Sequence, residues 1–76
     1  MSSPTPEALY KRIIEGIETK IAAGELKPGM KLPTPAELAE EYKCSEPTVR
    51  GALLRLKERG VLQGRQGRGT YVTPAP

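Results

Sequence analysis

Apolar residues recur with the spacing of a helix in the first third of the chain. Their i, i+3, i+4 pattern predicts an amphipathic helix over residues 6–23. Thr5 can cap this helix, Pro6 suits its first position, and Gly24 is a natural stop after its last turn. Gly16 lies beside the apolar stripe, which suggests close packing of another element there. The predicted inward-facing residues are Leu9, Tyr10, Ile13, Ile14, Ile17 and Ile21.

A second helical pattern follows a Pro-Gly turn and a short extended segment at residues 30–33. Thr34 and Glu37 match the two ends of a capping box, and a proline occupies the first helical position between them. We expect this helix to end near Lys43. Its predicted inward-facing residues are Leu38, Ala39 and Tyr42.

The third helical pattern begins at Ser45, a favourable N-cap residue, and ends at Gly60. Two β-rich triplets, residues 61–63 and 70–72, then flank a predicted hairpin loop at 64–69 that contains three glycines and two arginines. The order of three helices, a short extended segment after the first, and a closing hairpin predicts an α+β fold. The apolar face of the third helix consists of Val49, Ala52, Leu53 and Leu56.

With 76 residues the chain forms one small domain, which we expect at residues 6–73 between loose ends at 1–5 and 74–76. Its net charge of +3 is unevenly distributed. Residues 1–41 contain five basic and seven acidic side chains, whereas residues 42–76 contain seven basic and two acidic ones. A basic half on a near-neutral protein is typical of a protein that binds a polyanion. The alternative is an arginine-rich surface that contacts only solvent.

The composition argues against an enzyme, a metal site and a bound cofactor. The chain has no His and no Asp, and its one cysteine, Cys44, lacks the partners that a nucleophilic or metal site needs. The glycine-rich loop lacks the ending of a phosphate-binding nucleotide loop and does not precede a helix. No apolar run reaches the roughly 18–20 residues of a membrane span, and the first residues do not resemble a signal peptide. We therefore expect a cytoplasmic protein, associated with the nucleoid if it binds DNA.

The second and third helical patterns have the spacing of a helix–turn–helix. Ala39 is the small residue at the helix crossing, Lys43 and Cys44 form the turn, and Val49 is the apolar residue of the second helix. A glycine is usual in the turn, so Lys43 in a left-handed conformation would cost about 1 kcal/mol. Cys44 is then interpreted as a small buried residue that fills the turn.

The second helix of such a motif presents its N-terminal turn to the bases of the major groove. Ser45 and Thr48 offer hydroxyls to the backbone or the bases, and Arg50 can reach a phosphate or a guanine edge. Glu46 has two open interpretations: it interacts favourably with the helix dipole, or it accepts a hydrogen bond from a cytosine amine. The hairpin tip has the reach and charge to enter a minor groove through Arg65, Gln66, Gly67 and Arg68.

These ordered motifs resemble the winged helix–turn–helix domain of GntR-type bacterial transcription regulators. The resemblance covers about residues 9–73 and rests on L-P-T-P-A-E-L-A-E-E-Y, S-E-P-T-V-R-G-A-L-L-R-L, G-V-L and R-Q-G-R-G-T-Y-V. It implies a repressor-like domain that binds a double-stranded, pseudo-palindromic DNA operator, commonly as a homodimer. The DNA contacts that it implies are Thr34, Ser45, Thr48, Arg50, Gln66, Gly67 and Arg68.

Three departures from the family pattern affect what the resemblance implies. Ala36 and the Glu46-Pro47 pair stand where the family commonly has arginine or another polar residue, and Lys43 replaces the turn glycine. Base preference is therefore expected to differ from that of relatives. The family also usually adds a C-terminal effector-binding or dimerisation domain, for which this chain has no residues left. We expect either a short regulator or an isolated domain.

Two functions are consistent with the sequence. The first is sequence-specific binding of double-stranded DNA, which the basic half, the helix–turn–helix spacing and the arginine-tipped hairpin favour. The alternative is a winged-helix protein-interaction module with weakened DNA reading, which Ala36, Glu46 and the acidic first half favour.

Overall fold

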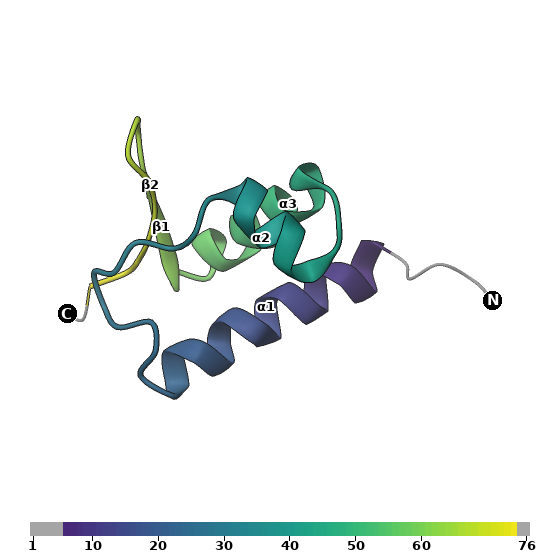
Figure 1. The fold of residues 1–76 in the computed structure, drawn as a ribbon. Helices are drawn as coiled ribbons and strands as arrows, with labels where there is room; N and C mark the ends of the chain where they lie inside the picture. Colours follow the sequence, from purple (N-terminus) through teal and green to yellow (C-terminus); the bar gives the residue numbers. More distant parts are fainter. Residues whose placement is uncertain (1–5, 75–76) are drawn as a thin grey trace.

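Three helices followed by a two-stranded hairpin make up the computed structural model, which describes residues 6–74 (Figure 1). The α+β prediction is confirmed, and each helix lies close to its predicted bounds. The cap predicted at Thr5 lies outside the described residues. The elements are α1 (Pro6–Ala22), α2 (Pro35–Tyr42), α3 (Glu46–Glu58), β1 (Leu62–Arg65) and β2 (Gly69–Val72).

The core lies between α1 and the two helices that cross above it in Figure 1. Ile13, Ile14 and Ile17 on the α1 stripe are buried, as predicted, and full burial of each such side chain stabilises the fold by roughly 1.5–3 kcal/mol. The close packing predicted at Gly16 is also confirmed, because a Cβ atom there would collide with the hydroxyl of Tyr42. The remaining buried residues are Leu32, Leu38, Ala39, Val49, Ala52, Leu53, Leu56, Leu62 and Val72.

Both ends of α2 have the local chemistry that the sequence predicts. Thr34 Oγ1 accepts a hydrogen bond from the Glu37 N–H at 3.1 Å, and Glu37 Oε1 accepts one from the Thr34 N–H at 2.9 Å. The helix ends at Lys43, whose φ of 53° makes it the single non-glycine residue with positive φ among residues 6–74. Lys43 thus takes the left-handed conformation that a glycine usually takes in such a turn, at a cost of about 1 kcal/mol.

The hairpin, which we call the wing (residues 62–72), is tighter than predicted. Its strands pair antiparallel from Leu62 opposite Val72 to Arg65 opposite Gly69, and the turn contains only residues 66–68. The prediction ended the first strand two residues too early and began the second one residue too late, because glycine has low strand propensity. Backbone groups of glycine still pair, however, and the Arg68 N–H closes the turn onto the Arg65 carbonyl at 2.9 Å.

The extended segment at residues 30–33 joins the wing through a single bridge rather than a full strand. Lys31 forms an isolated antiparallel bridge with Tyr71. The Leu32 N–H donates to the Thr70 carbonyl at 2.8 Å, and the Val72 N–H donates to the Met30 carbonyl at 2.8 Å. This pairing places the approach to α2 directly beside β2.

Candidate nucleic-acid interface

The start of α3 is fixed by hydroxyl groups. Ser45 has an extended backbone (φ −83°, ψ 156°), and its Oγ accepts a hydrogen bond from the Thr48 N–H at 3.4 Å. The two side-chain oxygens of Ser45 and Thr48 lie 2.8 Å apart. The capping role predicted for Ser45 is confirmed, and the pair forms a small polar site on the first turn. Ser45 is exposed and Thr48 is partly exposed.

The turn before α3 is closed by backbone hydrogen bonds. The Cys44 N–H donates to the Ala39 carbonyl at 2.9 Å, and the Lys43 N–H donates to the Glu40 carbonyl at 3.3 Å. The Cys44 side chain packs against the core but is only half-buried. It fills the turn as predicted, although the burial expected of it is incomplete because the turn lies at the protein surface.

Glu46 and Arg50 form an ion pair that the sequence interpretation did not include. Arg50 Nη2 lies 3.4 Å from Glu46 Oε1, one helical turn away on α3. Both side chains are largely exposed, at 65% for Arg50 and 47% for Glu46. The i, i+4 spacing of opposite charges was the signal that could have revealed this pair.

The wing presents two arginines in different settings. Arg68 lies in the turn with Gln66 and Gly67, and all three are exposed. Arg65 is the last residue of β1, not part of the turn, and its guanidinium lies 5.1 Å from the centre of the Tyr71 ring. The position predicted for Arg65 at the tip is thus corrected, because the strands extend farther than their propensities indicate.

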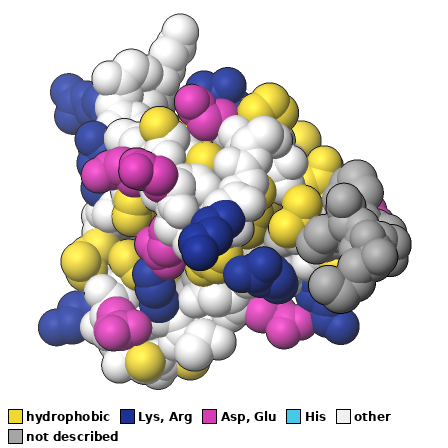
Figure 2. All heavy atoms as spheres, turned by 45° about the vertical axis from the view of Figure 1, so that its right-hand side comes forward, with side chains coloured by type: hydrophobic (Ala, Val, Ile, Leu, Met, Phe, Trp, Pro, Cys, Tyr) yellow, Lys and Arg dark blue, Asp and Glu magenta, His cyan; other side chains and the backbone are white. Residues whose placement is uncertain are grey.

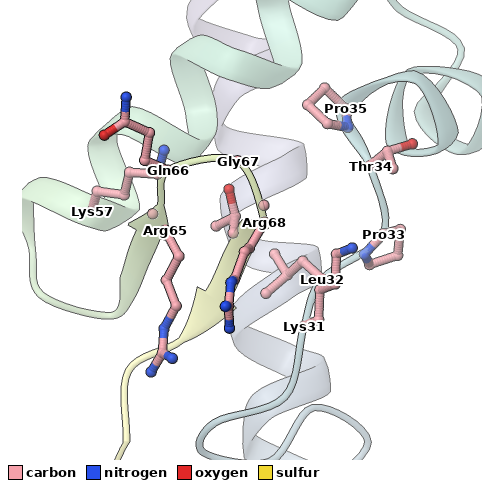
Figure 3. A pocket seen from close by; sticks show the side chains of 13 residues that line it. Lys31, Leu32, Pro33, Thr34, Pro35, Lys57, Arg65, Gln66, Gly67 and Arg68 are labelled. Atoms are coloured by element: carbon pink, nitrogen blue, oxygen red, sulfur yellow. The ribbon is translucent and has the colours of Figure 1, made fainter.

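A groove of about 560 Å³ separates the wing from the start of α2 (Figure 3). Its lining brings Thr34 together with all four predicted wing residues. The capping box fixes Thr34 at the rim, where the Thr34 N–H bonded to Glu37 lowers the pKa of that carboxyl. Ser45, Glu46, Thr48 and Arg50 do not line the groove and form a separate cluster on the first turns of α3. The groove is lined by residues 31–35, Lys57 and residues 64–70.

Two lysines on this groove were missed by the sequence interpretation. Lys57 of α3 lies over Gly64, where a Cβ atom would sit 3.2 Å from the lysine Nζ. Lys31 lies over Gly69, where a Cβ atom would sit 2.9 Å from the lysine Cε. The two glycines therefore make room for lysines that come from other elements. Lys57 follows Arg50 by two helical turns, so the helical periodicity of α3 could have placed both on one face.

Five cations elsewhere in the described part of the chain each form an ion pair with a glutamate, and the cations of this groove do not. Within residues 6–74, none of Lys31, Lys57, Arg65 and Arg68 forms an ion pair. All four side chains are exposed. A groove with four such cations and backbone glycines attracts a polyanion and permits its close approach.

Other classes of site find no support in the described part of the chain. Within residues 6–74 no three His, Cys, Asp or Glu side chains cluster as metal ligands would. No helix in that range has the length and hydropathy needed to cross a membrane.

Comparison with known proteins places the chain among bacterial regulators. Residues 9–72 match the family described as bacterial regulatory proteins, gntR family. The chain is 50% identical over 64 residues to the mannosyl-D-glycerate transport/metabolism system repressor MngR of Escherichia coli, covering 84% of this chain and 27% of MngR. It is 41% identical over 73 residues to the transcriptional repressor NagR of Bacillus subtilis, covering 96% of this chain and 30% of NagR. The chain thus spans less than a third of either relative.

Solved structures agree with this assignment. The DNA-binding domain of AraR in complex with operator ORX1 has a TM-score of 0.85 at 33% identity, covering 96% of this chain and 92% of that one. A GntR family transcriptional regulator from Listeria monocytogenes has a TM-score of 0.86 at 29% identity, covering 99% of this chain and 64% of that one. The winged helix–turn–helix fold and the resemblance to GntR-type regulators are confirmed. The chain belongs to the GntR family of bacterial regulatory proteins.

Proposed function

We propose that this chain is the DNA-binding domain of a bacterial transcriptional repressor and that residues 6–73 form the functional unit. The observation that carries the proposal is the groove beside the wing, whose four cations form no ion pair among the described residues. Its relatives MngR and NagR are repressors, and the similar AraR domain binds operator DNA. The site of action would be DNA in the bacterial cytoplasm.

In this proposal the first turns of α3 enter the major groove. Ser45, Glu46, Thr48 and Arg50 lie on consecutive turns and expose polar atoms from a helix whose start is fixed by capping. The positive end of the α3 dipole points toward the DNA in this arrangement. Base contacts from this turn supply the sequence preference, as in other helix–turn–helix domains.

The wing enters the adjacent minor groove in the same proposal. Arg65 and Arg68 contribute charge, Gln66 contributes an amide, and Gly67 (φ 74°) permits close backbone approach. Thr34 lies across the groove from the wing and offers an exposed side chain to the DNA backbone. Lys31 and Lys57 add positive charge beside Gly69 and Gly64, in the part of the wing next to its turn.

Binding affinity measured against salt concentration tests this function. If the four groove cations each neutralise one phosphate, log K falls with log salt concentration at a slope of about −4, since each phosphate contributes roughly −0.9. Selection of bound DNA from a random pool identifies the operator, and a palindromic result supports a homodimer on the DNA. A flat salt dependence together with a stable protein complex would instead favour the protein-interaction alternative.

A further inference from the structure

Arg50 is the exception among the cations of the candidate interface. Within residues 6–74, the four cations of the groove form no ion pair, whereas Arg50 at the start of α3 is held by Glu46 at 3.4 Å. The family pattern commonly has arginine or another polar residue at the position of Glu46. An acidic residue that neutralises a DNA-facing arginine weakens phosphate attraction, so its presence there requires an explanation.

The pair is well placed to hold Arg50 along the helix. Glu46 precedes Arg50 by four residues, which is the favourable order for an ion pair on a helix surface. Glu46 follows directly on Ser45, whose side chain caps the helix, so the carboxylate projects from a turn with a fixed backbone. Both side chains are accessible from solvent and therefore from DNA.

Phosphate and guanine respond differently to this pair. A phosphate that approaches Arg50 also approaches the Glu46 carboxylate, and the like charges repel each other. A guanine edge offers Arg50 two neutral acceptors and brings no negative charge against the carboxylate. The pair therefore favours a base contact over a backbone contact.

From this geometry we propose that Glu46 is a positioning residue that determines specificity through Arg50. It holds the guanidinium for a guanine edge and disfavours its binding to phosphate. This inference rests on the proposed DNA-binding function. It also accounts for the departure from the family pattern, because the lost general affinity is exchanged for discrimination among sequences.

The test compares Glu46→Gln with the unaltered chain on its selected operator and on a random duplex. Glu46→Gln keeps the shape of the side chain and removes its charge. Random-duplex affinity should rise about three- to tenfold, with a salt slope steeper by about one unit. Operator affinity should rise less. The specificity ratio, which is operator affinity divided by random-duplex affinity, should therefore fall at least about threefold. Far-UV circular dichroism verifies that both proteins are folded.

Glu58→Gln is the matched control for charge. Glu58 is exposed, is the last residue of α3, and forms no ion pair among the described residues. Its substitution changes the net charge by the same amount and should leave the specificity ratio unchanged. An equal fall of the specificity ratio in Glu46→Gln and Glu58→Gln would overturn the proposal, because the change in net charge alone would explain the fall.

A double-mutant cycle tests whether Glu46 acts through Arg50. In an Arg50→Ala background, Glu46→Gln should no longer change the specificity ratio. A change of the same size in that background overturns the positioning role and assigns Glu46 a direct effect on DNA. If the unaltered chain binds its operator with the expected salt slope but Glu46→Gln has no effect, this inference alone fails. If no salt-dependent binding occurs, the proposed function fails with it.

Discussion

The surface along α1 and its contacts with α2 and α3, which we call the α1 face, carries the same kinds of basic residue as the wing groove, but in a different electrostatic state. Four cations of the α1 face each lie against a carboxylate, although Arg12 of α1 meets none among the described residues. Figure 2 shows basic and acidic side chains interspersed over one face of the molecule. The wing groove has four cations without such a partner among residues 6–74. The pairs are Lys11–Glu15, Lys20–Glu41, Arg55–Glu7 and Arg59–Glu18.

The comparison shows that charge counted along the sequence does not measure charge available to a ligand. Arg55 and Arg59 belong to the basic half of the chain, yet the folded structure neutralises them with glutamates of α1. Lys31 belongs to the acidic half and reaches the wing groove. The attractive surface is therefore smaller than the basic half and more localised.

The largest expected effect follows from removing the unpaired charge of the wing. Arg65→Ala combined with Arg68→Ala should weaken operator binding about 10- to 100-fold and make the salt slope less steep by about two units, since two phosphate contacts are lost. Fluorescence anisotropy at several salt concentrations measures both quantities. Stability should change by less than about 0.5 kcal/mol, because both side chains are exposed.

The matched control removes two positive charges from the α1 face. Lys11→Ala with Lys20→Ala produces the same change in net charge, but both lysines already face glutamates. Affinity should therefore change only slightly. Equal losses from the two double variants would contradict the distinction between the faces.

A second prediction concerns the backbone that supports the wing groove. Gly69→Ala should destabilise the fold by about 1–3 kcal/mol, because Gly69 has a φ of 121° and an added Cβ would meet the Lys31 stem at 2.9 Å. Urea unfolding measures the loss. Gly64→Ala should cost less, since the nearest atom to its added Cβ is the flexible end of Lys57. A smaller loss at Gly69 than at Gly64 would refute this account.

The corresponding substitution on the α1 side is Gly16→Ala. Its added Cβ collides with the hydroxyl of Tyr42, which costs roughly 1–3 kcal/mol, offset by up to about 1 kcal/mol of better helix propensity. The free energy of unfolding should fall by about 1 kcal/mol, and the DNA affinity of the folded protein should not change. The loss should shrink in a Tyr42→Phe background, and equal losses in both backgrounds would exclude the hydroxyl as the cause.

The smallest expected effect is a dependence of stability on acid pH. Hydrogen bonds from Arg55 lower the pKa of Glu7, and the Thr34 N–H lowers that of Glu37. Both carboxyls bind protons more readily in the unfolded chain than in the folded one. The stability that the two ionised carboxyls contribute to the fold is therefore fully present above the ordinary pKa of 4.5. It is lost as the pH falls through their lowered pKa values in the folded state. Thermal midpoints from pH 7 to pH 3 should therefore decline. Glu7→Gln should flatten this decline, and an unchanged decline would contradict the role of the α1 pair.

Local chemistry made much of the fold predictable from the sequence. The capping box at Thr34, the N-cap at Ser45 and the left-handed Lys43 each depend on residues within one or two helical turns. Apolar periodicity likewise identifies the buried faces of all three helices. Strand ends were less predictable, because pairing across the wing extends beyond the residues with high β propensity.

The candidate site was predictable only in part. The wing residues and the start of α3 follow from motif order, and their contacts with DNA stay a prediction. The position of Lys31 and the three ion pairs that join α1 to α2 or α3 depend on residues that folding brings together: Glu7 and Arg55 are 48 residues apart in the sequence. No pattern of local spacing reports such a pair.

The contact between Arg65 and Tyr71 gives the wing an intrinsic optical reporter. The chain has no tryptophan to mask tyrosine emission, and its three tyrosines lie in three different parts of the fold. A guanidinium that leaves the Tyr71 ring for a phosphate changes the surroundings of that ring alone. Tyr10, stacked with Arg55 at 4.4 Å, and Tyr42, packed at Gly16, stay as they are. A Tyr10→Phe, Tyr42→Phe variant would make the fluorescence of this protein a dye-free signal of wing engagement.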